Sequence, residues 1–177
     1  PRMVEKAIAR ASEGGQRATR ICKAILDITC GKGCDDGAGS ENLRELVLQN
    51  LAAMGRDPSR DGIDLVLDIP EDTQVVARGL ELQQVLLNLI VNARRAVLAG
   101  RRPRRIELRA RREDQSVLID VIDNGVGIAP ESLDRIFEPF FTTKKSDDGT
   151  GLGLSIVYEA IKQVGGNFNV DSEVGFG

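Results

Sequence analysis

The spacing of hydrophobic and polar residues follows two periods along the chain, and each period predicts one kind of element. Apolar residues three, four and seven positions apart predict helices at residues 4–29, 41 to about 54, 80–98 and 152–164. Alternation or short apolar runs between turn residues predict strands at 63–69, 74–77, 105–112, 116–123 and 167–171. Helices packed on one mixed sheet predict the fold class, a two-layer α/β sandwich preceded by an N-terminal helix.

A polar stretch divides this pattern into two parts. Residues 31–40 hold four glycines and two aspartates, which predicts a loop and a domain boundary. The helix before it has a narrow stripe rich in small residues, typical of a helix–helix seam. Ser40 is the expected N-cap of the next helix. The predicted organisation is a helical segment, 1–36, followed by an α/β domain, 37–177.

Composition and charge exclude several functional classes. The 177 residues are 41% hydrophobic and 29% charged, as in a globular domain with a proper core. No apolar run approaches 18 residues, and the first residues lack the apolar segment of a secretory signal. We therefore expect a cytoplasmic location, although a full-length protein could carry a membrane anchor elsewhere. A net charge of −3 gives no general attraction to nucleic acid.

One segment, 101–112, is rich in arginine. It has two interpretations, a solvated turn and strand edge or a docking patch for a partner, and the first is favoured because charge runs commonly form exposed faces. Nucleic acid is not an expected partner, since the segment has no aromatic residues to stack on bases.

The cysteine and histidine counts narrow the chemistry further. Three cysteines, Cys22, Cys30 and Cys34, argue against a disulfide framework and favour free thiols in a reducing compartment. A zinc site lacks a fourth ligand at proper spacing. The chain has no histidine, so the commonest general base is absent.

Two asparagines give the expected helix 80–98 a polar face. Asn88 and Asn92 lie four residues apart, with Arg95 a turn later, while the apolar stripe occupies another face. Buried amides need partners, and their oxygens are hard ligands that suit Mg²⁺ together with phosphate oxygens. Two solvated asparagines on an exposed face are the equal alternative.

Three further segments combine glycine with polar or aromatic residues. Residues 123–128, Asp-Asn-Gly-Val-Gly-Ile, follow a strand, where the glycines permit a close ligand or simply make a turn. Residues 149–155, Gly-Thr-Gly-Leu-Gly-Leu-Ser, open a helix whose N-terminal N–H groups could receive phosphate. The segment 135–148 holds Phe137, Phe140 and two lysines, so it could be a loop anchored by aromatics or could contribute ordinary core packing.

In their order along the chain, the asparagine pair and the segments 123–128, 135–148 and 149–155 resemble the N, G1, F and G2 boxes of the Bergerat-fold ATPases, in the version of sensor histidine kinases. The resemblance covers residues from about 43 to 177. Gyrase, the Hsp90 chaperone and mismatch-repair relatives carry a glutamate where Asn88 stands, and that glutamate activates water. Its replacement implies phosphotransfer rather than ATP hydrolysis.

The resemblance also implies a role for each site residue. Asn92, assisted by Asn88, is expected to hold Mg²⁺, and Arg95 to contact phosphate. Asp123 is expected to receive the adenine amino group, in a pocket lined by Gly125, Gly127 and Ile128. The remaining expected contacts belong to the ATP lid and its end: Phe140, Lys144, Gly149, Thr150, Gly151, Leu152, Gly153 and Leu154. Ala96 replaces an aromatic residue that relatives carry near the base. No side chain is assigned as a catalytic acid, base or nucleophile.

The implied reaction moves the γ-phosphoryl of ATP to a histidine outside the chain, and then to an aspartate of a response regulator. The N-terminal helix resembles the second helix of a dimerisation and phosphoacceptor domain, which implies a possible homodimer of a longer kinase. The chain alone is expected to bind Mg-ATP without phosphorylating itself. The alternatives are a nucleotide-binding regulatory module without catalysis, a serine kinase of anti-sigma type, or a bare ATPase.

Overall fold

A computed structural model describes residues 39–55, 57–143 and 149–177 of the chain. Its elements, in chain order, are β1 (Gly39–Asn42), α2 (Leu43–Ala53), the 3-10 helix η1 (Pro58–Asp61), β2 (Ile63–Asp68), β3 (Gln74–Ala77), α3 (Gly79–Ala99), β4 (Arg104–Glu113), β5 (Ser116–Asp123), α4 (Pro130–Leu133) and α5 (Gly153–Gln163). The helix expected at 4–29, the three cysteines and Lys144 lie outside the described residues. Within those residues, no helix is long and apolar enough to span a bilayer.

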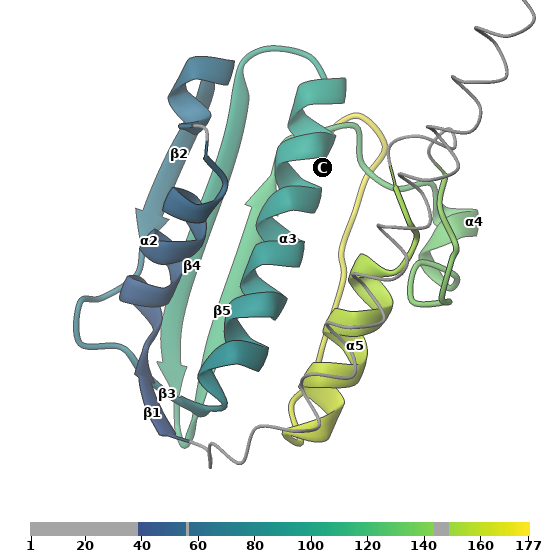
Figure 1. The fold of residues 1–177 in the computed structure, drawn as a ribbon. Helices are drawn as coiled ribbons and strands as arrows, with labels where there is room; N and C mark the ends of the chain where they lie inside the picture. Colours follow the sequence, from purple (N-terminus) through teal and green to yellow (C-terminus); the bar gives the residue numbers. More distant parts are fainter. Residues whose placement is uncertain (1–38, 56, 144–148) are drawn as a thin grey trace, which may run out of the picture.

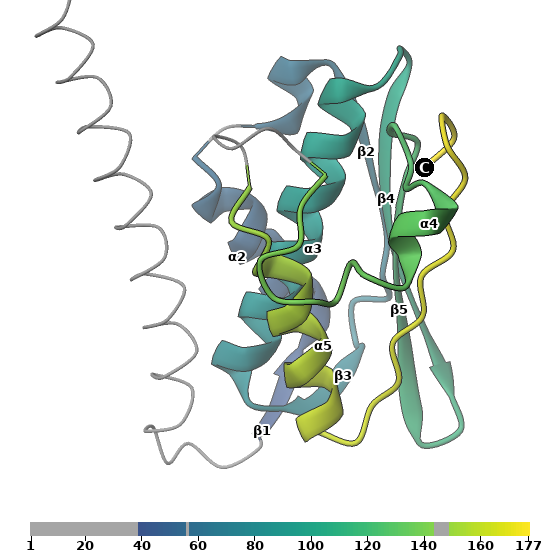
Figure 2. The ribbon, with the colours of Figure 1, turned by 90° about the vertical axis from the view of Figure 1, so that its right-hand side faces the viewer.

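The sheet is mixed, as the sequence predicts. Strand β4 lies between β2, which is parallel to it, and β5, which is antiparallel to it. Strands β1 and β3 form a separate antiparallel pair. Helices α2, α3 and α5 stand on one side of β2, β4 and β5, so the two-layer α/β sandwich is confirmed (Figures 1 and 2).

The core lies between α2, α3 and the sheet. Leu43 and Val47 of α2, Leu86 and Ile90 of α3, and Leu108 of β4 are almost fully buried there. Helix α3 buries a stripe of apolar residues at helical spacing because one of its faces rests on the strands. Nearer the C-terminal end of α3, Arg94 forms an ion pair with the Asp61 carboxylate of η1. This ion pair holds η1 against the helix.

The start of α2 differs from the sequence-based expectation. Ser40 and Glu41 belong to β1, and Ser40 hydrogen-bonds Gln74 of the facing strand. The N-cap is Asn42, whose Oδ1 accepts a hydrogen bond from the Glu45 N–H at 3.0 Å. Asn42 also donates to the Glu71 carbonyl oxygen at 2.8 Å. The expected cap at Ser40 is wrong because β1–β3 pairing continues for two residues beyond it.

The strand expected at 167–171 is also wrong. This segment runs beside β5 in both views, but no backbone hydrogen bond among the described residues joins them (Figures 1 and 2). Asn167, Asn169 and Asp171 are exposed and have low strand propensity. The Phe168 ring instead packs edge-on against Phe137, with centroids 5.5 Å apart.

The arginine-rich segment is not a strand edge, since β4 is the central strand of the sheet. Its residues alternate, so Ile106, Leu108 and Ala110 are buried under the helices while Arg105, Arg109 and Arg111 lie on the opposite face. Arg104 lies on the helix side, where its guanidinium donates to the carbonyl oxygens of Asp61 and Leu98. On the opposite face Arg109 donates to Glu107 at 2.7 Å, and Arg105 bridges Asp64 at 2.9 Å. The hydrogen bond from Arg109 lowers the pKa of Glu107. Several of the arginines therefore pair within the sheet.

The corrected N-cap gives a first prediction. Asn42→Ala removes the oxygen that accepts from the Glu45 N–H, so it should lower the free energy of unfolding by about 1 kcal/mol. Ser40→Ala is the matched control, and it should change that free energy by less than about 0.5 kcal/mol. Urea denaturation measures both. A larger loss for Ser40→Ala than for Asn42→Ala would contradict the assignment.

Candidate functional site

The amide face of α3 meets the beginning of α5. A Cβ atom placed on Gly153, the first residue of α5, would lie 3.6 Å from Asn88 Oδ1 and 3.6 Å from Asn92 Nδ2. Both asparagines are half-buried, and neither amide hydrogen-bonds another described residue. The face that carries them is thus half-buried rather than fully exposed. Helices α3 and α5, which carry these residues, lie side by side in Figure 1.

Helix α5 begins without a side-chain cap. Leu152 occupies the N-cap position, and no side chain bonds the N–H groups of the first turn as a cap. Leu152 is buried and its carbonyl oxygen accepts from Ser155 Oγ at 2.9 Å. The first N–H groups of a helix carry partial positive charge and favour an anion. An uncapped N-terminus thus faces two amide side chains.

The loop 123–128 leaves the end of β5 and packs on α3. Asp123 Oδ1 accepts a hydrogen bond from the Gly125 N–H at 2.8 Å. Asn124 is held by the Arg105 N–H and by the Pro103 carbonyl oxygen, each at 2.7 Å. Gly125 is buried, and a Cβ there would lie 2.4 Å from the Ala96 carbonyl carbon. Only glycine allows the loop to approach the helix this closely.

The other side of this loop meets the last residues of the chain. Gly127 has φ +67°, and a Cβ there would lie 2.1 Å from the Glu173 carbonyl oxygen. The Ile128 N–H donates to Ser172 Oγ at 2.8 Å. The sequence did not indicate that Ser172 contacts this loop. The local pattern is only a serine followed by Gly175 and Gly177, which by itself predicts no partner.

The two ends of the expected lid are joined through their backbones. The Phe140 N–H donates to the Gly151 carbonyl oxygen at 2.9 Å. Both residues have positive φ, +69° and +68°, and a Cβ on Gly151 would lie 2.4 Å from the Phe140 carbonyl carbon. Next to this junction the Leu152 N–H reaches Thr150 Oγ1 at 3.4 Å. Residues 140 and 151 are therefore held against each other.

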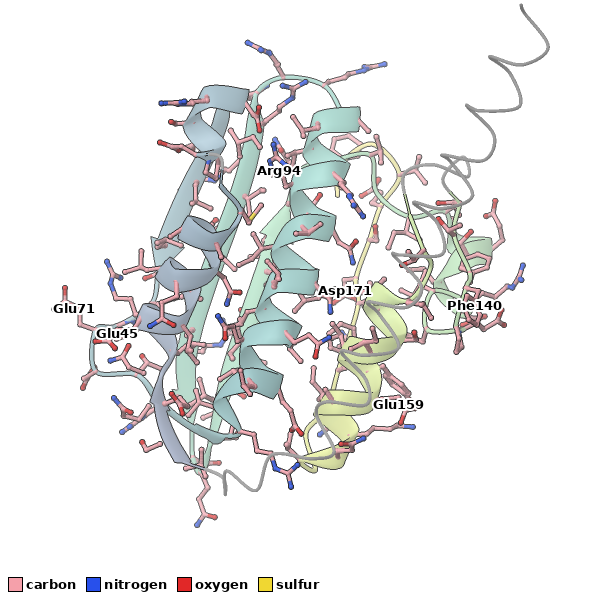
Figure 3. The ribbon with its side chains drawn as sticks, in the orientation of Figure 1. Glu45, Glu71, Arg94, Phe140, Glu159 and Asp171 are labelled. Carbon is pink, nitrogen blue, oxygen red and sulfur yellow. The ribbon has the colours of Figure 1, made fainter. Side chains whose placement is uncertain are left out.

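The two phenylalanines of the predicted anchor behave differently. Phe137 stacks on Tyr158 of α5, with ring centroids 4.9 Å apart, which favours the packing interpretation for this residue. Phe140 is 63% exposed, so core packing by this residue is wrong. Its side chain projects from the loop beyond α5 in Figure 3. The backbone contact to Gly151, rather than ring burial, fixes its position.

The other residues expected to contact ATP differ in how close they lie to the start of α5. Gly149, Thr150 and Leu154 are half-buried beside the N-terminus of α5. Arg95 is exposed on α3 and forms no ion pair with a described residue, whereas its neighbour Arg94 is paired (Figure 3). Among the described residues, no three histidine, cysteine, aspartate or glutamate side chains are grouped to bind a metal.

This arrangement agrees with the comparisons to known proteins. Residues 77–177 match the family described as histidine kinase-, DNA gyrase B- and HSP90-like ATPase. The chain belongs to this family. The match begins at the end of β3 and includes α3, the loop 123–128 and α5.

Relatives within this ATPase family are sensor kinases. The chain is 45% identical over 128 residues to the two-component sensor PprA of Pseudomonas aeruginosa, covering 70% of this chain and 14% of PprA. It is 40% identical over 163 residues to the sensor histidine kinase ZraS of Salmonella typhimurium, covering 91% of this chain and 34% of ZraS. The chain thus spans about a third or less of these relatives.

Solved structures of histidine kinases share the fold. The catalytic domain of ThkA superposes with a TM-score of 0.61 at 32% identity, covering 71% of this chain and 80% of that one. Full-length ShkA in complex with AMPPNP gives a TM-score of 0.71 at 27% identity, covering 97% of this chain and 36% of ShkA. The chain is thus homologous to the ATPase domains of two-component sensor kinases.

The close approach of Gly125 to α3 gives a second prediction. Gly125→Ala forces its methyl group against Ala96, so unfolding free energy should fall by about 1–3 kcal/mol. Gly39→Ala is the control, since its Cβ would meet only the flexible Glu41 carboxylate at 3.7 Å. Chemical denaturation compares the two variants. Equal stability of Gly125→Ala and the unmodified chain would contradict the packing described.

Proposed function

We propose that this chain binds Mg-ATP as the catalytic domain of a sensor histidine kinase. The reaction transfers the γ-phosphoryl group to a histidine outside the chain and then to a response-regulator aspartate. The observation that carries the proposal is the meeting of the Asn88–Asn92 amide pair with the uncapped N-terminus of α5. Two amide side chains, whose oxygens can bind a cation, meet N–H donors for an anion there, as a metal–phosphate complex requires.

The proposed nucleotide lies between this junction and the loop 123–128. Asp123 accepts a hydrogen bond from the adenine amino group, while Gly125, Gly127 and Ile128 line the base pocket. Glycine at 125 and 127 supports this assignment, because both positions make backbone contacts that a side chain would block. AMPPNP in the homologous full-length ShkA supports an adenine nucleotide as the ligand.

The phosphates lie toward α5 and the lid in this proposal. Gly149, Thr150, Gly151, Leu152, Gly153 and Leu154 border the phosphates, and Arg95, Phe140 and Lys144 complete the expected contacts. The Phe140–Gly151 backbone contact supports a lid hinged at residues 140 and 151. Exposed Arg95 is available to reach a phosphate because its guanidinium forms no ion pair with a described residue.

The donor set at the α3–α5 junction fits Mg²⁺. Amide oxygens are hard ligands, and Mg²⁺ commonly takes few protein ligands and completes its shell with water and phosphate oxygens. The unpartnered amides of Asn92 and Asn88 are suited to this role. Bound Mg²⁺ would neutralise phosphate charge. The chain itself positions the nucleotide through backbone N–H groups and excludes water with the lid.

The phosphoacceptor must come from another polypeptide segment, since none of the 177 residues is a histidine. We propose that residues 1–36 belong to a dimerisation and phosphoacceptor domain and that 37–177 form the catalytic domain. The partners are then ATP, the phosphoacceptor helix, a response-regulator receiver domain and, in the whole protein, a second copy. We further propose that this domain lies in the cytoplasm, where ATP is available to it.

Transfer in trans tests the proposal. Labelled ATP, Mg²⁺ and this chain should phosphorylate a separate polypeptide carrying the histidine-bearing helix of the full-length kinase, giving acid-labile phosphohistidine. Asn92→Ala should weaken Mg-ATP binding roughly ten- to hundredfold, because a charge-assisted contact is lost. Calorimetric titration with and without Mg²⁺ measures this loss.

Asn169→Ala is the control, since it removes the same amide from an exposed segment after α5. It should leave both binding and transfer unchanged. Tight binding without transfer would favour the regulatory module, and hydrolysis without an acceptor would favour an ATPase. Unchanged Mg-ATP affinity in Asn92→Ala would remove the basis of the proposed site.

A further inference from the structure

The last six residues form a hook around the loop 123–128. The hook, residues 172–177, contacts four residues of this loop, which are Asp123, Val126, Gly127 and Ile128. Its residues lie at the chain end marked C, next to the end of β5 (Figures 1 and 2). The hook thus borders the loop on the side opposite α3, where Gly125 packs on Ala96.

One hydroxyl group links the hook to the loop. Ser172 Oγ accepts from the Ile128 N–H at 2.8 Å and donates to the Gly177 carbonyl oxygen at 3.0 Å. That same carbonyl oxygen accepts from the Glu173 N–H at 2.7 Å. The hydroxyl therefore closes the hook on itself and, at the same time, satisfies a backbone donor of the loop.

The backbone contacts around this hydroxyl leave the loop little freedom. The Gly175 N–H donates to the Val126 carbonyl oxygen at 2.8 Å. Gly127 lies against the Glu173 carbonyl oxygen, and Gly177 lies against the Asp123 carbonyl oxygen, so closely that neither position admits a Cβ. A displaced hook would therefore release the loop at every one of these points.

We propose that Ser172 is a positioning residue for the base-binding loop. This inference rests on the proposed function, in which Asp123 receives the adenine amino group. Asp123 Oδ1 is itself bonded to the Gly125 N–H, so the carboxylate turns with the backbone of the loop. The Ser172 hydroxyl keeps that backbone in one shape before the nucleotide arrives, which lowers the ordering cost of binding.

The test compares Ser172→Ala with Ser172→Thr, which keeps the hydroxyl. Ser172→Ala should bind adenosine, ADP and ATP about five- to twentyfold more weakly, since two hydrogen bonds that order the loop are lost. The factor should be the same for all three ligands, because the loop contacts the base, and the Mg²⁺ dependence should not change. Ser172→Thr should restore most of the affinity.

Two controls separate positioning from folding. Ser116→Ala removes a similar hydroxyl-to-carbonyl bond, to Glu113 at the far end of the β4–β5 hairpin, and should leave binding unchanged. Thermal denaturation should show that Ser172→Ala is folded at the temperature of the titration. In the absence of nucleotide, hydrogen exchange at the Ile128 amide should be faster in Ser172→Ala than in the unmodified chain.

The outcomes distinguish this inference from the proposed function. Failure of the unmodified chain to bind any adenine nucleotide would overturn the proposed function, and the inference with it. Binding by the unmodified chain with equal affinity in Ser172→Ala would overturn the inference alone. A loss confined to ATP, or unchanged exchange at the Ile128 amide, would also overturn it.

Discussion

Helix α3 is packed on two sides, and the rest of the domain depends on this double contact. One face buries Leu86, Ile90 and Val97 against the sheet, which fixes the helix in the core. Asn88 and Asn92 lie on another face of α3, next to Gly153 at the start of α5. Because both faces belong to one rigid helix, the apolar packing also sets the position of the polar pair.

Glycine provides the close contacts that assemble loops around this helix. Gly125 lets the loop after β5 rest on Ala96, and Gly151 lets the chain before α5 cross the backbone of Phe140. Gly153 leaves open the space in front of the two amides. Gly125 and Gly151 are far apart in the sequence, but each brings its backbone closer to another segment's backbone than a side chain would allow. The domain thereby gathers backbone N–H groups near one face of α3.

Much of this arrangement could be predicted from periodicity and local chemistry. The bounds of β3 and β5 agree with the predicted ranges, and α3 and α5 differ by one residue at each end, because their apolar spacing is regular. The polar face of α3 could also be predicted, because Asn88 and Asn92 lie four residues apart on one side of a helix. The order of glycine-rich segments supplied the family resemblance, which the family match confirms.

The errors came from contacts between residues distant in sequence. Ser40 has the right chemistry for a cap, but pairing of β1 with β3 moves the start of the helix to Asn42. Residues 167–171 alternate like a strand, yet Phe168 packs on Phe137 and no ladder forms with β5. The hook at 172–177 was missed for the same reason, since a serine and two glycines become informative only when the loop 123–128 lies against them.

The central claim is that the amide pair of α3 and the N-terminus of α5 hold one metal–phosphate complex. The most direct measurement replaces Mg²⁺ with paramagnetic Mn²⁺ and follows the chain by NMR during titration with ATP. The account predicts selective broadening of the Asn88 and Asn92 side-chain amides and of the Gly153 backbone amide, with Gly39 unaffected. Broadening centred elsewhere, with these three signals unchanged at saturation, would contradict it.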